Sequence, residues 1–127
     1  MAISNDLILE WIDRIANLQG LQMDPTALAD DVLLMAFVYK KEEEFVLAMS
    51  QVVRAIGQLV ANKVEVSQLE RNYSGWDSYH FQSRRVQGQG ADLRIVFQST
   101  SANTIKIKGF SNRHIPSDIY KRLGSRR

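Results

Sequence analysis

The chain has 127 residues, the usual size of one domain, and a formal net charge of only +2. It has no cysteine and only two histidines, which excludes a disulfide framework and a thiolate metal site and argues against a metal cage or a metal cofactor. No apolar run approaches the ~20 residues of a membrane span and the N-terminus lacks the basic region of a secretory signal, so we expect a single cytoplasmic domain with no membrane partner.

The first predicted element is an amphipathic helix over residues 4–18, capped by Ser4 or Asn5 and ended by Gly20. Its apolar face is formed by Leu7, Ile8, Trp11, Ile12, Ile15 and Leu18. Because these residues recur at steps of three and four, we expect one face of this helix to pack against the core.

A second helix is predicted to begin at Asp24 and Pro25, because aspartate caps a helix N-terminus and proline fits its first turn. The end of this helix stays open. The continuous apolar run 32–39 fits either the end of the helix or a separate buried strand, and periodicity does not decide between them.

The longest predicted helix covers residues 40–62. Apolar residues recur along it at steps of three and four, at Phe45, Val46, Met49, Val52, Val53, Ile56, Leu59 and Val60. Glu42, Glu43 and Glu44 lie in its first turn, where the helix dipole favours negative charge. We interpret this acidic triplet as a helix start in preference to a set of catalytic carboxylates.

After residue 70 the pattern changes from helix to strand. Three strand-like runs follow, at residues 79–86, 93–99 and 104–110. The short connections between them indicate an antiparallel meander. Strand alternation directs Leu93 and Ile95 to one face and Arg94 to the other, together with Lys106 or Lys108 of the next strand.

These elements predict an α+β fold in a single domain, residues 1–127. An extra N-terminal helix occupies residues 1–22 and the rest of the helical part residues 23–70. The helices are expected to pack on one face of a small antiparallel sheet within residues 71–127, which ends in a short helix beginning near Pro116.

Charge is segregated along the chain. Residues 1–70 contain five Lys and Arg against eleven Asp and Glu, whereas residues 71–127 contain eleven Lys and Arg against three Asp. A basic half of this kind favours polyanions, because clustered cations release condensed counterions when they meet phosphates. The acidic half is expected to neutralise part of that charge.

Five side chains of the basic half are candidates for chemistry on a phosphate, namely His80, Arg94, Arg113, His114 and Tyr120. Cleavage of RNA without a metal needs a base for the 2′-hydroxyl, cations around the phosphate and an acid for the leaving oxygen. Each candidate has a structural alternative: Arg94 pointing to solvent, Arg113 as a loop cation, the histidines as surface residues and Tyr120 as a core contact. A choice between base stacking and core packing likewise applies to Tyr73, Trp76, Tyr79 and Phe81.

The order of motifs from Tyr79 onward narrows these alternatives. A tyrosine-led strand, a glycine-containing turn, the run LRIVFQ, a short turn, the run TIKIKGF, an S-x-R motif and a later tyrosine follow one another. This order resembles the C-terminal half of the RelE/ParE superfamily of bacterial toxins. The resemblance implies that Arg94 and Arg113 contact the scissile phosphate and that Tyr120 supports the substrate base or proton transfer.

The sequence departs from the RelE pattern at both ends. The pattern has two lysines in the strand after the tyrosine, where this chain has His80 and Gln82, so His80 or His114 is expected to carry protons. The family opens with a strand and a helical hairpin, for which the run 32–39 and the helix after it are the candidates. The acidic helix of residues 1–22 is an addition, and we expect it to lie across the basic sheet or to help a partner do so.

The resemblance implies a RelE-like toxin of a type II toxin–antitoxin pair, an mRNA endonuclease that acts on the ribosome by acid–base chemistry without metal or cofactor. Its partners would be mRNA on the ribosome and a cognate antitoxin, and the oligomeric state stays open, a homodimer included. Alternatives are a ParE-like gyrase inhibitor, or a non-catalytic nucleic-acid-binding or regulatory module on the same fold. Further residues expected to bind nucleic acid are Arg84, Arg85, Lys106, Lys108, Lys121 and Arg122.

Overall fold

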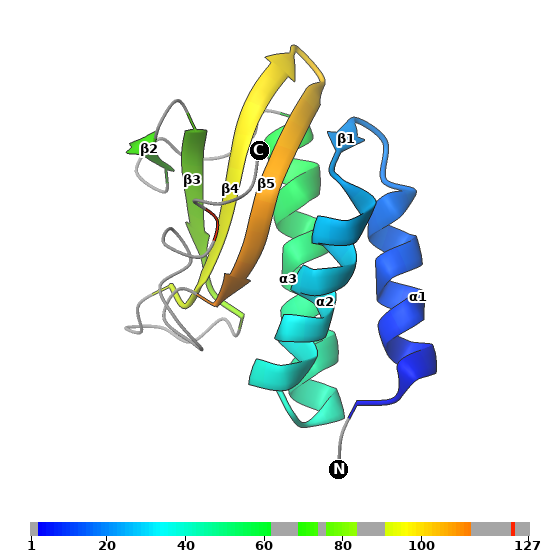
Figure 1. Cartoon of the computed structure of the whole chain (residues 1–127). Coiled ribbons are helices and arrows are strands. Elements are labelled where there is room, and N and C mark those ends of the chain that lie inside the picture. Colours follow the sequence, from blue (N-terminus) through cyan, green and yellow to red (C-terminus); the bar gives the residue numbers. More distant parts are fainter. Residues whose placement is uncertain (1–2, 62–68, 74–75, 84–90, 113–122, 124–127) are drawn as a thin grey trace.

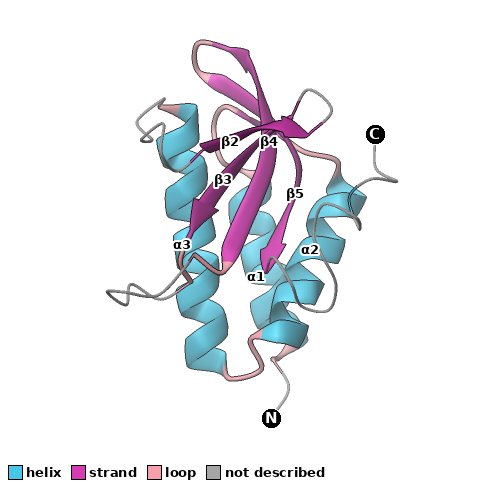
Figure 2. Cartoon of the chain, turned by 90° about the vertical axis from the view of Figure 1, so that its left-hand side faces the viewer, coloured by secondary structure: helices cyan, strands magenta, loops and turns pink. Residues whose placement is uncertain are grey.

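The computed structural model of the chain describes residues 3–61, 69–73, 76–83, 91–112 and 123. Within these ranges, three helices cover one face of a mixed β-sheet, as the two views in Figures 1 and 2 show. This two-layer arrangement confirms the predicted α+β fold. The predicted C-terminal helix lies outside the described residues except for Leu123.

The three predicted helices are α1 (Asn5–Ala16), α2 (Pro25–Val38) and α3 (Glu42–Val60). Two of them begin at side-chain caps, which satisfy backbone N–H groups that a helix leaves without an internal acceptor. The Ser4 hydroxyl accepts from the Leu7 backbone N–H at 3.2 Å, and the Asp24 carboxylate accepts from the Ala27 N–H at 2.9 Å. In α3 the acidic triplet occupies the first turn, as predicted.

The apolar run 32–39 completes α2, so the alternative of a separate buried strand is wrong. Val32 and Met35 are fully buried at helical spacing. Leu33 and Phe37 of the same run are 51% and 59% exposed. Because both faces of this run are apolar, its pattern carries no period, and only packing against the sheet separates the buried face from the exposed one.

The sheet is larger than the predicted meander. Its strands are β1 (Leu21–Gln22), β2 (Leu69–Tyr73), β3 (Trp76–Phe81), β4 (Leu93–Ser101) and β5 (Thr104–Asn112). They follow the order β1-β5-β4-β3-β2, with β1 parallel to β5 and all other neighbours antiparallel. The order and direction of β3, β4 and β5 confirm the meander. The first of these strands was misplaced, because β3 begins at Trp76 and ends at Phe81, and not at residues 79 and 86.

The turn between α1 and β1 depends on Gly20. This glycine has a φ of 81°, in the left-handed region that side chains disfavour, and its carbonyl accepts from the Ile105 N–H at 2.8 Å. A Cβ at this position would collide with the carbonyl oxygen of Asn103 and with Val60. Gly20 therefore allows β1 to approach the start of β5 closely. The prediction that Gly20 ends the first helix is wrong, because α1 ends at Ala16 and Asn17 is its C-cap.

The main core fills the space between the helices and the inner face of the sheet. It contains, on the sheet side, Tyr79, Phe81, Leu93, Ile95, Phe97, Ile105, Ile107 and Phe110. Ile8, Trp11 and Ile15 of α1 are buried in the same cluster, and α1 lies against α2 (Figure 1). The hypothesis that the acidic N-terminal helix lies across the basic face of the sheet is wrong, because the apolar face of α1 is buried in the main core and α1 packs against α2.

A buried carboxylate joins α2 to the edge of the sheet. Strand β1 pairs only with the first part of β5, at Ile105 and Lys106, and beyond it the edge of β5 faces α2. There Asp31, which is completely buried, accepts from the Phe110 backbone N–H at 3.0 Å. Asp31 thus satisfies an edge donor that would otherwise be buried without an acceptor.

Candidate nucleic-acid interface

The face of the sheet turned away from the helices carries the described candidate residues. We define this outer face by Trp76, Ser78, His80, Arg94, Val96, Gln98, Lys106, Lys108 and Ser111. Its members alternate with the core residues of β3, β4 and β5, as strand geometry requires. The prediction that Arg94 lies on the opposite face from Leu93 and Ile95 is confirmed.

His80 and Arg94 are brought together by strand pairing. The register of β3 and β4 places them directly opposite each other, and Ser111 of β5 lies on the other side of Arg94. Directly opposed residues on one face lie about 5 Å apart at their Cβ atoms, so these side chains form one polar row across three strands. Two candidates that are 14 positions apart in the chain are therefore neighbours in the fold.

Arg94 is buried beneath the outer face, with only 5% of its surface exposed, so the alternative of a solvent-facing arginine is wrong. One of its terminal nitrogens, Nη1, donates to the carbonyl oxygens of Ala91 at 2.7 Å and Leu93 at 2.9 Å. These hydrogen bonds stabilise the backbone of residues 91–93, where β4 begins. Arg94 consequently has a structural role, whatever it does to a ligand.

Lys106 and Lys108 form a second basic group, at the other end of the outer face. Their ammonium nitrogens lie 5.9 Å and 5.2 Å from the centre of the Trp76 ring, within the range of cation–π attraction. Lys106 is exposed and Lys108 is partly buried. Lys106 and Lys108, two of the three lysines predicted for nucleic-acid binding, thus lie on the predicted face.

The aromatic candidates are core residues where their side chains are described. Tyr79 and Phe81 stack with ring centres 5.5 Å apart on the inner face, and the Tyr79 hydroxyl donates to the Gln58 side-chain oxygen at 3.2 Å. Trp76 packs in a small outer cluster with Val96 and Leu123. Base stacking on these three rings is therefore the wrong alternative.

The remaining predicted site residues lie outside the described residues. They are Arg84, Arg85, Arg113, His114, Tyr120, Lys121 and Arg122. The convergence of Arg94 and Arg113 on one phosphate accordingly stays a prediction, as does the choice between His80 and His114.

A polar cluster that the sequence did not indicate lies where β3 ends, β4 begins and β5 ends. The Asp92 carboxylate accepts from the Tyr39 hydroxyl at 2.7 Å, from the Ser83 backbone N–H at 2.7 Å and from the Ser83 hydroxyl. The Asn112 amide donates to the Tyr39 oxygen at 3.3 Å. The cluster ties the end of α2 to three strand ends, two residues from Arg94. The one available signal was that Asp92 is among only three acidic residues in residues 71–127.

Tyr39 in this cluster is held in its protonated form. Burial raises the pKa of Tyr39 to about 12, since the phenolate would lose its hydration, and the neighbouring Asp92 acts in the same direction. Hydrogen bonds with Asn112 and Ser83 oppose this rise without cancelling it. At neutral pH Tyr39 is therefore a hydrogen-bond donor and not a base.

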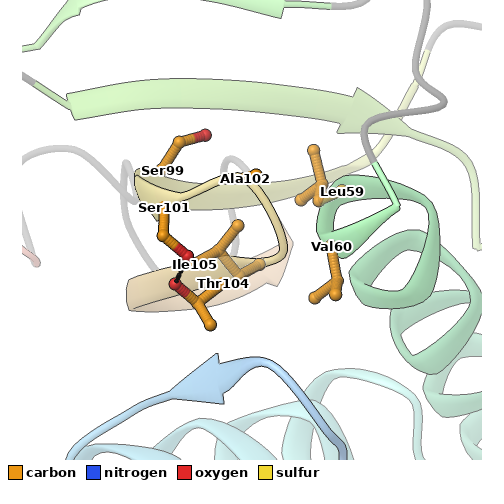
Figure 3. Close-up of a pocket in the computed structure, with 7 residues that line it drawn as sticks. All are labelled: Leu59, Val60, Ser99, Ser101, Ala102, Thr104 and Ile105. Atoms are coloured by element: carbon orange, nitrogen blue, oxygen red, sulfur yellow. Dashed lines mark hydrogen bonds between the residues drawn. The ribbon is translucent and has the colours of Figure 1, made fainter.

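Two hollows lie away from the predicted residues. One, of about 150 Å³, is bounded by the end of α3 and the β4–β5 hairpin (Figure 3), with Leu59, Val60, Ser99, Ser101, Ala102, Thr104 and Ile105 around it. The other, of about 180 Å³, is lined by Ile12, Ala16, Leu21, Met23, Pro25 and Leu28. Neither lining includes a charged or imidazole side chain, so neither offers a group for acid–base chemistry.

The chain matches no protein-family model, no curated protein and no solved structure. The relationship to the RelE/ParE superfamily therefore stays a prediction. Among the described helices, none combines the length and the apolar character that crossing a bilayer requires.

Proposed function

We propose that the chain is a RelE-like toxin of a type II toxin–antitoxin pair, which binds mRNA on the ribosome with its outer face and cuts it. The observation that carries this proposal is the opposed pair His80 and Arg94, on the same face of the sheet as Lys106 and Lys108. An imidazole beside a guanidinium supplies two of the three kinds of group that metal-free RNA cleavage needs, a base and a cation.

The order of elements also supports the proposal. From Leu21 onward the chain runs through a short strand, a helical hairpin and then antiparallel strands, which is the opening expected of the family. The strand is β1 and the hairpin is α2 with α3, so the run 32–39 was the wrong candidate for the strand. Helix α1 precedes this unit as an addition.

In the proposed reaction His80, which is partly exposed, takes the proton of the 2′-hydroxyl, since imidazole is the commonest general base in proteins. Arg94 acts as a fixed positive charge beneath the phosphate, held by the carbonyls of Ala91 and Leu93. A buried cation with a bound phosphate above it exchanges part of its lost hydration for a charge-assisted contact. The 2′-oxygen then attacks the phosphorus and the bond from phosphorus to the 5′-oxygen breaks. In this proposal His114 or Tyr120 donates the proton that the leaving 5′-oxygen takes up, and Arg113 is the second cation at the phosphate.

The second candidate function is a ParE-like gyrase inhibitor or another non-catalytic binding module. One observation favours it. Arg94 is only 5% exposed, and its Nη1 donates hydrogen bonds to two backbone carbonyls. The contribution of these hydrogen bonds to the stability of the fold is enough to explain the arginine, without a role in catalysis. The outer face then serves only for binding.

The decisive experiment compares cleavage of a reporter mRNA in a cell-free translation system, mapped by primer extension. We expect the parent protein to cut the translated message and the His80→Gln variant to be slower by about 10²-fold or more, the usual loss when an acid–base group is removed. The matched control is Lys40→Gln with Lys41→Gln, at the exposed turn between α2 and α3, which should cut like the parent.

Three outcomes separate the candidates. Cleavage that is equal in the parent and in His80→Gln removes His80 from the reaction and leaves His114 as the proton carrier. Intact message together with blocked DNA supercoiling by gyrase supports the ParE-like candidate. Suppression of either activity by a small acidic protein from the neighbouring gene identifies the cognate antitoxin.

A further inference from the structure

The two lysines of β5 are held together on the outer face by one aromatic ring. Their spacing of two residues places Lys106 and Lys108 on the same side of the strand. The register of β4 and β5 slips between Val96 and Phe97, which makes Lys108 the extra residue of a β-bulge. Both ammonium groups then lie within 6 Å of the Trp76 ring centre, at 5.9 Å and 5.2 Å.

Trp76 cannot serve as a platform for a nucleobase in this arrangement. Its surface is only 8% exposed, and it packs against Val96 and Leu123. The ring instead faces the two cations, which its negative π-face attracts. Trp76 is therefore a positioning residue for charge, and not a residue that reads a base.

The ring holds two ammonium groups close together, and a phosphate that contacts both gains two charge-assisted contacts. Lysine contacts phosphate as a compact point charge and needs no fixed orientation of the phosphate oxygens. We propose that Lys106 and Lys108, positioned by Trp76, form a sequence-independent subsite for the phosphates of single-stranded RNA. This inference rests on the proposed function for its choice of RNA as the polyanion.

The subsite is separate from the row that contains Arg94. Lys106 is opposite Gln98, which lies four positions from Arg94 along β4. At about 3.3 Å per residue this is about 13 Å along the strand, which is longer than one phosphate group. The RNA strand that occupies the Arg94 row therefore presents a different phosphate to Lys106 and Lys108.

The test measures binding of the full chain to fluorescently labelled oligouridylate and oligoadenylate, each about twelve nucleotides long, by anisotropy across a salt series. For single strands the slope of log K against log salt is about −0.7 per phosphate contacted. We expect Lys106→Gln with Lys108→Gln to make this slope shallower by about 1.4 and to weaken both oligonucleotides equally. Lys40→Gln with Lys41→Gln, a matched pair of lysines on the α2–α3 turn, should leave the slope unchanged.

The role of Trp76 is tested by rescue. Trp76→Phe keeps a ring and should keep the parent slope, whereas Trp76→Leu should lose about half or more of the two-lysine contribution. Circular dichroism confirms that each variant is folded. A slope that the lysine substitutions do not change, no binding by the parent at low salt, or a preference for oligoadenylate that Trp76→Leu abolishes overturns the subsite.

The subsite and the endonuclease proposal fail in different ways. Cleavage of message by a parent whose salt slope does not depend on the two lysines overturns the subsite and leaves the endonuclease standing. If the salt slope becomes shallower in the two-lysine variant as expected, but the parent cuts no message, the subsite is supported and the endonuclease proposal is overturned.

Discussion

The two faces of the sheet are built from different kinds of side chain. The inner face presents aromatic and aliphatic residues to three helices, within one continuous core. The outer face presents a histidine, an arginine and two lysines, with a small cluster of Trp76, Val96 and Leu123 between them. Since apolar burial dominates stability, the inner face should determine whether the chain folds and the outer face what it binds.

The largest expected effect tests this division on a single strand. Phe110→Ala removes a completely buried ring from the inner face of β5, and we expect the free energy of unfolding to fall by about 3–5 kcal/mol. Lys106→Gln, on the outer face of the same strand, should change it by less than about 0.5 kcal/mol. Urea denaturation measures both, and similar losses for the two variants would contradict the division.

A smaller loss is expected at the turn that joins the helical layer to the sheet. Gly20→Ala forces a side chain into a backbone with φ of 81° and against the Asn103 carbonyl, so it should cost about 2–3 kcal/mol. Gly57→Ala is the matched control. Its Cβ would meet nothing, and it lies within α3, so this substitution should stabilise by about 0.5–1 kcal/mol. Equal effects at the two glycines would show that the turn is not constrained.

The contact of α2 with the sheet edge is expected to contribute less again. Asp31→Ala removes the acceptor of the Phe110 N–H, which should cost about 1–3 kcal/mol and speed hydrogen exchange at that amide. Asp30→Ala, at the exposed neighbouring position, should change stability by less than about 0.5 kcal/mol and leave the amide protected. Unchanged protection of the Phe110 amide in Asp31→Ala would rule out this role.

The smallest expected effect depends on pH. The folded pKa of Tyr39, about 12, lies above the ordinary value of 10.0, so folding favours the protonated phenol. Its contribution is complete below pH 10 and is lost as the pH rises through 12. At pH 7, Tyr39→Phe should be less stable than the parent by about 1 kcal/mol through the lost hydrogen bonds. That gap should narrow as pH rises from 10 towards 12, and a constant gap in denaturation experiments would disprove the assignment.

Much of the fold was predictable because its signals are local. The caps Ser4 and Asp24 and the three-and-four spacing of α1 and α3 lie within a few residues of the structure they specify. Alternation in β4 and β5 likewise assigned Arg94 and the two lysines to the outer face before any partner strand was known.

The candidate site was predictable only in part. Sequence pattern placed Arg94 on the correct face, but it did not indicate that the side chain is buried and bonded to Ala91 and Leu93. It also left two interpretations of Trp76, base stacking and core packing, and the packing of Trp76 against Leu123 supports the second. Both outcomes depend on neighbours that strand pairing and the far end of the chain supply.

The sequence by itself therefore determined the helices, the order of the meander and which residues share a face, because each follows from the spacing of side chains along one element. The tertiary structure decided that the run 32–39 is helical and that the two-residue β1 pairs with β5. It also decided the hydrogen bonds from Tyr39 to Asp92 and from the Phe110 N–H to Asp31. These links join residues 53 and 79 positions apart. A hydrogen bond over such a separation forms because folding excludes water from both groups at once, and no local pattern records which two groups will meet.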